Sequence, residues 1–229
     1  MQIPENIKLL SAYDIGQLLH KKKMCPIDLV NFYYSEIESF TKPSPYTILT
    51  KKRALLEAEN SKKRLLEDKP LSHLDGVPVA WKDLFDFQDF ITVGGSKLLE
   101  NNLPAKSDAH VVSLSKKAGL IQLGKTSTVE FALGGLGTNN NFITPENAIM
   151  DDEPRVPGGS SSGSGVALAH GLCAASFGTD TGGSVRVPSA WNKLIGLKTS
   201  FGRVSLKGVL PLSSTLDTVG PLAKSVMDI

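Results

Sequence analysis

The sequence predicts an α/β fold, because short apolar segments that favour strands alternate with longer segments of helical periodicity. The strand-like segments are 45–49, the beginning of 76–86, 120–123 and 174–178. The helix-like segments are 26–40, 51–67, 107–119 and 166–174. The last of these is small and apolar on all sides, which is typical of a helix buried against a sheet.

The first seventy residues are predicted to be mainly helical. Pro26 suits the first turn of the helix over 26–40, since a backbone N–H is not needed at that position. The short segment 45–49 (PYTIL) is expected to form a strand between this helix and the next. Within 51–67, the residues that share one helical face are Ala54, Ala58, Ser61 and Leu65.

From residue 71 onward, strands and helices are predicted to alternate. Ser107 is expected to cap the helix over 107–119, and Gly119 is expected to end it. Its buried face is expected at Val111, Leu114 and Ala118.

Composition limits the class of protein. The 229 residues are 41% hydrophobic and 21% charged, with a net charge of +2, which is typical of a globular protein. Basic clusters such as Lys21–Lys22–Lys23 are interspersed with acidic residues, so neither nucleic acid nor a membrane surface is expected as a direct partner. No segment approaches the roughly 18 consecutive apolar residues of a membrane span.

The positions of the cysteines and histidines predict a protein of a reducing compartment without a metal site. Cys25 and Cys173 lie too far apart to suggest a disulfide framework. The first residues, MQIPENIKLL, lack the pattern of a signal peptide, so we expect a cytoplasmic location. Cys173 follows His170 by three residues, but in an apolar segment it is expected to be a buried small side chain rather than a nucleophile. The four histidines are scattered, and no metal site is expected.

Two segments rich in glycine and serine stand out in the second half of the sequence. The first, PGGSSSGSG at 157–165, has the composition of a flexible linker. It leads directly into 166–174, however, without the change of composition that separates domains. The second, Gly182–Gly183–Ser184, follows the strand predicted at 174–178. From composition alone, a linker and a functional loop both remain open for the first segment.

The segment GLIQLGKT at 119–126 matches the pattern of a phosphate-binding loop. Such a loop needs pliable backbone between its glycines, so that several amides can surround the phosphate oxygens. Here the intervening residues 120–123 are themselves predicted to form a strand, and a helix precedes Gly119. We therefore expect no nucleotide binding at this segment.

Gly182–Gly183–Ser184 contains the parts of a nucleophilic site. Glycines allow successive backbone N–H groups to point at one atom, and a serine beside them can act as a nucleophile if a base is present. His170 is the nearest histidine, but it is predicted to be a core or surface residue. Lys82 follows an apolar strand segment and could act as the base if burial made it neutral, although a lysine at a strand end also commonly extends to water.

Three separated motifs agree in order and spacing with a known family. VAWKDLFD at 79–86, PGGSSSGSG at 157–165 and GTDTGGSVRVPS at 178–189 together resemble the amidase signature family of serine hydrolases. The resemblance is closest over 158–205, and the segments 124–132 and 216–226 extend it over most of the chain.

The resemblance implies an α/β fold with a mixed β-sheet core covered by helices. It implies one domain over 1–229, with a mainly helical part over 1–70 and a catalytic α/β core over 71–229. Family members are considerably longer, so the core is expected to be incomplete at the C-terminus.

The family's functional positions correspond to residues of this sequence. Ser184 matches the nucleophile, Ser160 matches a bridging serine that follows a cis peptide bond, and Lys82 matches the base. The backbone amides that match the oxyanion hole belong to Thr181, Gly182, Gly183 and Ser184. The supporting positions match Ser161, Thr179, Asp180 and Arg186.

The resemblance implies hydrolysis of an amide C–N bond through an acyl-enzyme intermediate, with release of ammonia or an amine and a carboxylate. The expected partner is a small-molecule amide, and no cofactor is expected. Two protein partners stay open, a second copy of the chain and a missing C-terminal half.

Two alternatives stay open. One is a glutaminase like the A subunit of glutamyl-tRNA(Gln) amidotransferase. That protein commonly has glutamine where this chain has Val187 and Phe-Cys-Gly where this chain has 191–193, so a stand-alone amidase is favoured. The other is a truncated, inactive fragment, because the chain stops just after Ser225, which could cap a further helix.

Overall fold

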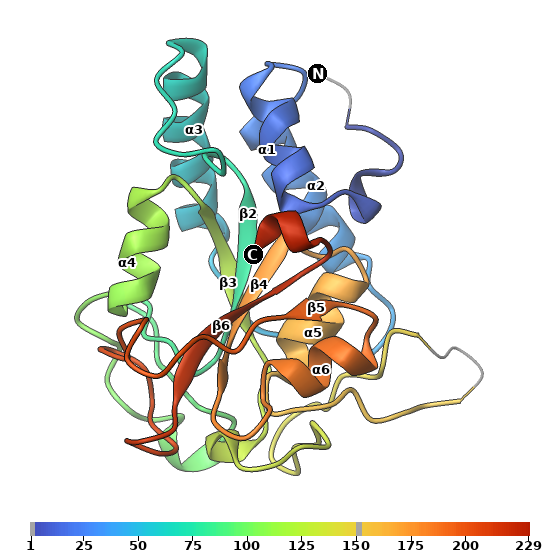
Figure 1. Cartoon of the computed structure of the whole chain (residues 1–229), viewed down its shortest axis with the longest axis vertical. Coiled ribbons are helices and arrows are strands. Elements are labelled where there is room, and N and C mark those ends of the chain that lie inside the picture. The colour runs from blue at the N-terminus through green and yellow to red at the C-terminus, as the bar shows by residue number, and fades with distance from the viewer. Residues whose placement is uncertain (1–2, 150–152) are drawn as a thin grey trace.

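A six-stranded mixed sheet forms the centre of the fold (Figure 1). The computed structural model describes residues 3–149 and 153–229. The strand order is β1-β3-β2-β4-β6-β5. The strands are β1 (Tyr46–Leu49), β2 (Pro78–Lys82), β3 (Ile121–Thr126), β4 (Ala175–Asp180), β5 (Ile195–Gly196) and β6 (Thr218–Ala223).

The three central strands are parallel. β2 pairs with β3 on one side and with β4 on the other, whereas β1 pairs with β3, and β6 with β4 and β5, in antiparallel register. The carboxyl ends of β2, β3 and β4 therefore meet at one edge of the sheet, the place where open α/β sheets usually bind ligands. The predicted mixed sheet is confirmed.

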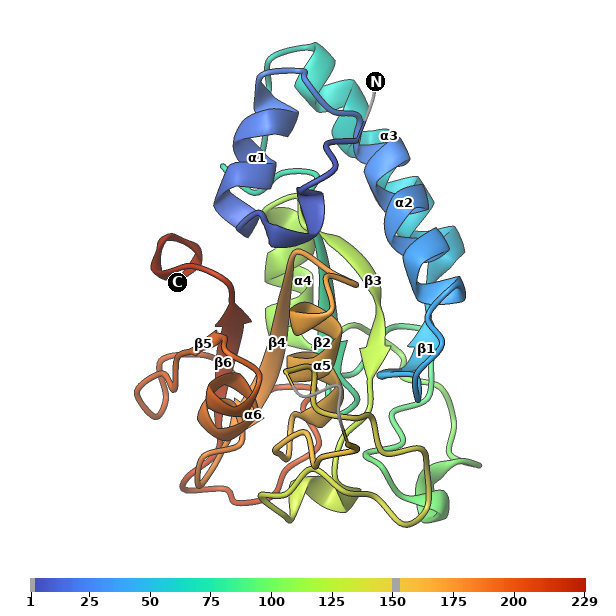
Figure 2. The same ribbon diagram turned by 90° about the vertical axis from the view of Figure 1, so that its right-hand side faces the viewer.

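Helices cover both faces of this sheet. Figure 1 shows α4 on one side of the sheet and α5 with α6 on the other. In Figure 2, α1 lies beyond one end of the strands, and α2 and α3 run down beside β3 towards β1. The helices are α1 (Ala12–His20), α2 (Pro26–Glu38), α3 (Lys51–Leu66), α4 (His110–Lys117), α5 (Ser162–Ala169) and α6 (Arg186–Trp191). Short 3-10 segments are Ile7–Leu9, Lys97–Leu99, Glu130–Ala132 and Val226–Asp228.

The helical N-terminal part agrees with its sequence pattern. Pro26 is the first residue of α2, and the strand expected at 45–49 is present as β1. The buried residues of α3 are the four at helical spacing, Ala54, Ala58, Ser61 and Leu65. A serine capping box at Ser225 opens the segment Val226–Asp228, in agreement with the capping role expected for this serine.

The prediction for the helix over 107–119 is partly wrong. α4 begins only at His110, after the N-cap Ala109, and its buried residue is Val112, while Leu114 is exposed. The start is delayed because Asp108 receives two hydrogen bonds from Arg53 and one from the backbone N–H of Gln88, which hold the preceding segment extended. Gly119 ends the helix region as predicted, with a φ of +90°.

The second half of the glycine–serine segment is helical, which corrects two expectations. α5 covers Ser162–Ala169, so it begins four residues before the predicted 166 and ends before Cys173. Gly163 makes the early start feasible, because a Cβ there would lie 2.4 Å from the carbonyl oxygen of Pro45. The serines of this segment are buried, with Ser160, Ser161 and Ser164 at 0% exposure. A flexible linker is therefore ruled out for this segment.

Residues 121–126 form the fully buried strand β3, so the match to a phosphate-binding loop has no loop to support it. Gly124 lies inside the strand because the neighbouring strand β1 approaches its Cα closely. A Cβ at this position would lie 2.2 Å from the carbonyl oxygen of Ile48. The expected absence of a phosphate cradle at this segment thus has a structural reason.

The core beneath the sheet edge is aromatic. Trp81, fully buried in β2, stacks on Phe177 of β4 at 4.2 Å between ring centroids and meets Phe85 edge-on at 5.0 Å. Its indole N–H donates to the Gln122 side chain at 2.6 Å. These contacts fix the side chain of the strand residue that precedes Lys82.

Across residues 3–149 and 153–229, none of the helices has the length and apolar character needed to cross a membrane.

Candidate active site

The candidate site lies where β2 and β4 end and α5 begins. Lys82 is the last residue of β2, and Thr179 and Asp180 are the last two residues of β4. Ser160 and Ser161 directly precede α5. The parallel pairing of β2 with β4 brings these segments together although they are far apart in the sequence.

Lys82 is buried and lies between two hydroxyl groups. Its Nζ is 2.7 Å from Ser160 Oγ and 2.8 Å from Thr179 Oγ1, and the residue is 0% exposed. Burial lowers the pKa of Lys82 to about 7, although the negative charges of Asp180 and Asp217 act in the opposite direction. A substantial fraction of Lys82 is therefore neutral near pH 7 and can accept a proton.

Ser160 is held by its backbone as well as by Lys82. The peptide bond between Gly159 and Ser160 is cis. The carbonyl oxygen of Ser160 accepts a hydrogen bond from Thr128 Oγ1 at 2.9 Å and one from the N–H of Val129 at 3.2 Å. The Ser160 hydroxyl is thus fixed beside the lysine amine.

Ser184 lies in the turn after β4 and is half-buried. Its carbonyl oxygen accepts a hydrogen bond from the N–H of Ser161 at 3.2 Å, which ties the two glycine–serine segments together. No hydrogen bond joins the Ser184 hydroxyl to another described residue, Ser160 included. The turn therefore leaves this hydroxyl open to an incoming group.

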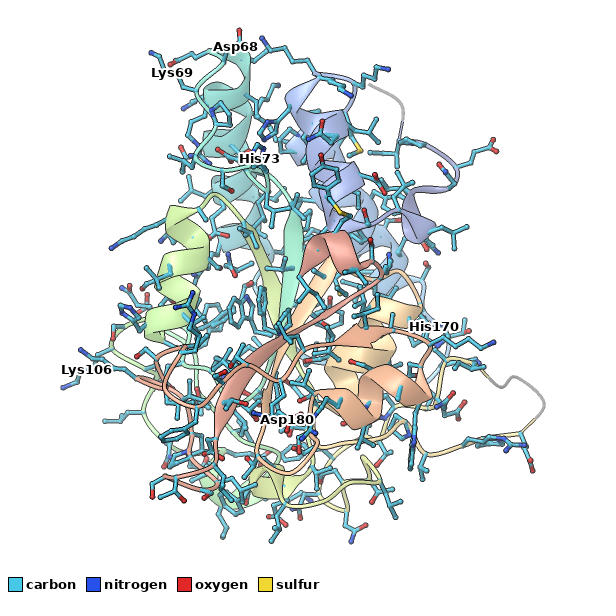
Figure 3. All side chains as sticks on the ribbon, viewed as in Figure 1. Asp68, Lys69, His73, Lys106, His170 and Asp180 are labelled. Carbon is cyan, nitrogen blue, oxygen red and sulfur yellow. The ribbon has the colours of Figure 1, made fainter. Side chains whose placement is uncertain are left out.

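Asp180 organises the turn that carries Ser184. Its carboxylate accepts hydrogen bonds from the N–H groups of Gly183 (2.8 Å) and Val185 (3.1 Å). It also accepts two from the Arg186 guanidinium, at 3.0 and 2.9 Å. Burial acts to raise the pKa of Asp180, but the hydrogen bonds from Arg186 and the backbone prevail and hold it below its ordinary value. Figure 3 shows Asp180 at this edge of the sheet and His170 well away from it.

The structure differs from the sequence-based assignment at one backbone amide. The family resemblance implies that Gly183 contributes its N–H to an oxyanion hole, but that N–H donates to Asp180. Among the described residues, no hydrogen bond engages the N–H groups of Gly182 and Ser184. The N–H of Thr181 likewise has no hydrogen-bond partner among the described residues, so these three amides are available within the turn.

Two residues that sequence reasoning missed complete the surroundings. Asp217 accepts a hydrogen bond from Thr181 Oγ1 at 2.5 Å, and its other oxygen accepts from the backbone N–H groups of Leu212 and Ser213. Thr128 anchors the carbonyl oxygen of Ser160. Asp217 lies in the segment 216–226, which extends the family resemblance. This place in the sequence was the signal from which Asp217 could have been predicted as a site residue.

The four supporting residues are brought together around the site. Thr179 contacts Lys82, while Asp180 and Arg186 hold the turn through their ion pair. Ser161 Oγ donates to the carbonyl oxygen of Thr179 at 3.4 Å. Within the described part of the chain, no group of three or more His, Cys, Asp or Glu side chains could hold a metal ion.

Cys173 and His170 do not form a second site. Cys173 is buried and unpaired, and burial raises the pKa of its thiol to about 12, so the thiolate is not populated near neutral pH. His170 follows the end of α5 and packs edge-on against Phe40.

In this mixed sheet, β2 ends at a buried lysine, and the turn after β4 and the loop before α5 each carry a serine. The chain is therefore an α/β protein with a lysine–serine centre. Comparison with known proteins narrows this class. A model of the Amidase family matches residues 28–229. The chain belongs to the Amidase family.

Relatives and solved structures agree with this membership. The A subunit of glutamyl-tRNA(Gln) amidotransferase from Syntrophobacter fumaroxidans is 37% identical over 220 residues, which cover 96% of this chain and 44% of that protein. Fatty acid amide hydrolase of Arabidopsis thaliana is 38% identical over 219 residues, covering 94% and 36%. The structure of the peptide amidase of Stenotrophomonas maltophilia matches with a TM-score of 0.87 and 30% identity, over 95% of this chain and 46% of that one. The chain thus spans less than half the length of these relatives.

Proposed function

We propose that the protein hydrolyses an amide C–N bond, with Ser184 as nucleophile, Ser160 as proton relay and Lys82 as base. The observation that supports this most directly is the buried, partly neutral Lys82 amine at 2.7 Å from Ser160 Oγ. A serine hydroxyl attacks an amide only when a neighbouring group takes its proton, and Lys82 is suited to do so through Ser160.

The proposed reaction has two halves. Ser184 Oγ attacks the amide carbonyl carbon and gives its proton to Ser160 Oγ, which passes its own proton to Lys82 Nζ. The tetrahedral intermediate then loses the amine, which receives the proton back through Ser160, and an ester to Ser184 remains. Water attacks this ester in the same way and releases the carboxylate, so each proton removed in a step is returned within it.

We propose that the backbone amides of Thr181, Gly182 and Ser184 stabilise the negative oxygen of the intermediate. The N–H groups of Gly182 and Ser184 carry no hydrogen bond to a described residue. Gly183 would join them only by giving up its bond to Asp180. Ser161, Thr179, Asp180 and Arg186 are proposed to position these groups without touching the substrate.

The relay also requires Ser160 to reach Ser184, a hydrogen bond that the described residues do not form. Ser160 is fixed by Lys82 and by its backbone, whereas the Ser184 hydroxyl has no partner among the described residues. We propose that rotation of the Ser184 side chain closes this contact when the substrate is bound, as catalytic hydrogen bonds often tighten only in the complex.

Labelling and hydrolysis together test the proposed nucleophile. The full chain should react with a fluorophosphonate and release ammonia from a simple primary amide, and Ser184→Ala should abolish both. The matched control is Ser189→Ala, which should keep both activities. Ser189 is a buried serine of α6 whose hydroxyl donates to the carbonyl oxygen of Val185. Labelling or hydrolysis that persists in Ser184→Ala would overturn the assignment.

A glutaminase is the second candidate, because several relatives are A subunits of glutamyl-tRNA(Gln) amidotransferase. Val187 and the segment 191–193 depart from the residues common in those proteins, so we propose a stand-alone amidase. The cytoplasm is the proposed location, in keeping with the two unpaired cysteines. Release of ammonia from glutamine only in the presence of the other amidotransferase subunits would favour the second candidate.

A further inference from the structure

The turn after β4 carries the backbone N–H groups of the proposed oxyanion hole. A peptide unit is planar and trans, so a hydrogen bond to its carbonyl oxygen or to its N–H fixes the direction of both groups. Two units of the turn are fixed in this way from within the turn and α6. The N–H of Gly183 donates to Asp180 at 2.8 Å, and the carbonyl oxygen of Gly183 accepts from the N–H of Val187 at 2.7 Å. The second bond sets the direction of the Ser184 N–H.

Thr218, the first residue of β6, fixes the peptide unit that carries the Thr181 N–H. Its hydroxyl donates to the carbonyl oxygen of Asp180 at 2.7 Å, and the antiparallel pairing of β4 with β6 places these two residues opposite each other. Thr218 is 3% exposed, so this hydroxyl is shielded from water. The bond therefore sets the direction of the Thr181 N–H, which donates to no described residue.

The remaining peptide unit, between Thr181 and Gly182, has no hydrogen bond of its own to a described residue. It is held through the Thr181 side chain, whose Oγ1 donates to Asp217 Oδ1 at 2.5 Å. Asp217 is 5% exposed, and its other oxygen accepts from the N–H groups of Leu212 and Ser213 at 2.9 and 3.0 Å. Because both oxygens are occupied, Asp217 is suited to hold a neighbour rather than to exchange protons.

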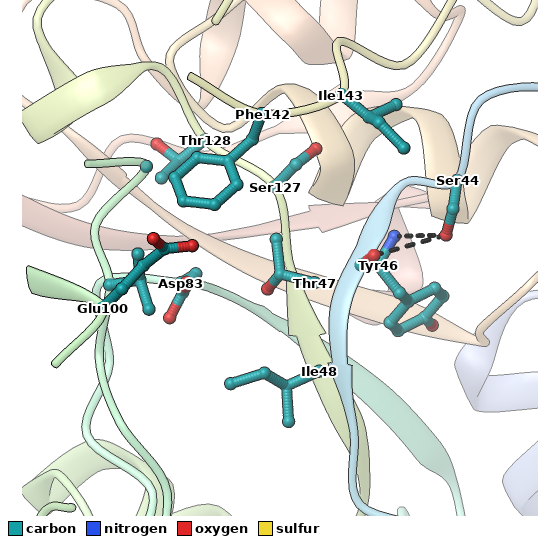
Figure 4. A pocket seen from close by; sticks show the side chains of 12 residues that line it. Ser44, Tyr46, Thr47, Ile48, Asp83, Glu100, Ser127, Thr128, Phe142 and Ile143 are labelled. Carbon is teal, nitrogen blue, oxygen red and sulfur yellow. Dashed lines mark hydrogen bonds between the residues drawn. The ribbon is translucent and has the colours of Figure 1, made fainter. Parts of the chain in front are cut away.

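A buried threonine holds the other serine segment in the same manner. Thr128, which is 2% exposed, donates its hydroxyl hydrogen to the carbonyl oxygen of Ser160 at 2.9 Å. It also lines the cavity beside β1 that Figure 4 shows. Buried hydroxyl groups therefore fix backbone carbonyls in both segments that carry the serines of the site.

We propose that Asp217 and Thr218 are positioning residues, which hold the N–H groups of Gly182 and Thr181 in the direction that the negative oxygen of the tetrahedral intermediate requires. This inference rests on the hydrolysis proposed above. Donors that are oriented beforehand stabilise developing charge well, because they do not reorganise during the reaction. Two adjacent residues at the beginning of β6 thereby serve the site without touching the substrate.

Thr218→Val and Thr181→Val test the proposal, because each removes one hydroxyl and keeps the backbone N–H. In hydrolysis of a primary amide by the full chain, we expect each variant to lower kcat by about tenfold or more and to leave KM unchanged. This pattern is that of an interaction made only in the transition state. Thr218→Ser restores the hydroxyl and should recover most of kcat. Thr215→Val, at an exposed position of the same loop, is the matched control and should keep kcat.

Nuclear magnetic resonance tests the same positions without turnover. The backbone N–H order parameters of Thr181 and Gly182 should be those of rigid backbone in the unmodified chain, about 0.85. The order parameter of Gly182 should fall in Thr181→Val. It should also fall in Asp217→Asn, which places an NH₂ group beside backbone N–H groups that need an acceptor. Thr215→Val should leave the order parameters unchanged.

Unchanged kcat in both valine variants would overturn the proposal, and so would order parameters that stay at the value of the unmodified chain. A loss of kcat in Thr218→Ser as large as that in Thr218→Val would also overturn it, because the hydroxyl would then not be the cause. If the unmodified chain hydrolyses no amide, the proposed hydrolysis fails. The order parameters still decide in that case whether Asp217 and Thr218 hold the turn.

Discussion

Lys82 Nζ lies 2.7 Å from Ser160 Oγ, although the two residues are 78 positions apart in the sequence. The contact depends on two different elements, the carboxyl end of β2 and the loop that precedes α5. Burial of the lysine gives the contact its chemical character, because it shifts the amine towards its neutral form.

Amide hydrolysis should increase with pH through about 7. Lys82 must be neutral to accept a proton, and burial lowers its pKa to about 7. A plot of kcat/KM for a primary amide between pH 5 and 9 should rise to a plateau with its midpoint near this value. A flat profile, or one that falls over this range, would contradict the assignment of Lys82 as the base.

Lys82→Met should stabilise the fold more at pH 7 than at pH 10. The pKa of Lys82 falls from its ordinary 10.5 to about 7 in the folded state. Between these values the unfolded chain binds a proton that the folded chain does not, so the free energy of unfolding falls as the pH is lowered from 10.5 to 7. Methionine removes this dependence, and the difference between the two pH values should be on the order of a few kcal/mol.

Urea unfolding of both proteins at the two pH values measures this difference. Lys52→Met, at an exposed position of α3, is the control and should shift both values equally. An equal effect of Lys82→Met at pH 7 and pH 10 would mean that Lys82 is not neutral in the folded protein.

Gly182 and Gly183 should respond differently to alanine. A Cβ at Gly182 meets nothing within 4 Å, so Gly182→Ala should fold normally but fill space beside Ser184 that the substrate needs. We expect a rate loss of about 10²-fold or more. Gly183 has a φ of +136° and a Cβ there would lie 3.1 Å from Val187, so Gly183→Ala should also lose about 1 kcal/mol of stability.

Thermal melts combined with a hydrolysis assay separate the two effects. Retained activity in Gly182→Ala would argue that the substrate does not approach the turn from this side. A melting temperature lowered equally in both variants would contradict the additional cost expected from the positive φ and the Val187 contact at Gly183.

Replacing either Asp83 or Lys125 alone should lower the free energy of unfolding far more than replacing both together. They form an ion pair at 2.6 Å with side-chain exposures of 1% and 0%, and burial raises the pKa of Asp83 and lowers that of Lys125. Asp83→Asn leaves the lysine charge buried without compensation and should cost about 3–5 kcal/mol. Replacing both with Leu and Met should recover most of that loss.

A double-mutant cycle by urea unfolding measures the coupling in this pair. Additive losses in the double variant would show that the two charges are each satisfied by other groups, such as Thr92, whose hydroxyl is 3.0 Å from Lys125 Nζ.

We propose a single domain over 1–229, and a single unfolding transition follows from it. One hydrophobic cluster contains residues from the helical part, such as Leu29 and Tyr33, together with sheet residues such as Val79 and Leu222. Far-UV circular dichroism and the fluorescence of buried Trp81 should therefore change at the same denaturant concentration. Two separate midpoints would assign residues 1–70 and 71–229 to independent units.

The sequence by itself determined the strands β1 to β4 and the residues that are candidates for chemistry, but it did not predict β5 and β6. Local periodicity identified the buried face of α3, and the two glycine–serine segments with Lys82 marked the site, because these signals depend on neighbours along the chain. Composition could not distinguish a linker from a loop at 157–165, since glycine and serine suit both.

Only the tertiary structure decided the features that depend on contacts between residues far apart in the sequence. Arg53 and Gln88 hold Asp108 and delay the start of α4, and burial in β2 lowers the pKa of Lys82. The N–H of Gly183, which the family resemblance assigns to an oxyanion hole, donates to Asp180 in the folded turn. The start of α4 and the pKa of Lys82 depend on residues that are far apart in the sequence, and the bond of Gly183 depends on the conformation of the folded turn. A local sequence pattern does not predict such contacts.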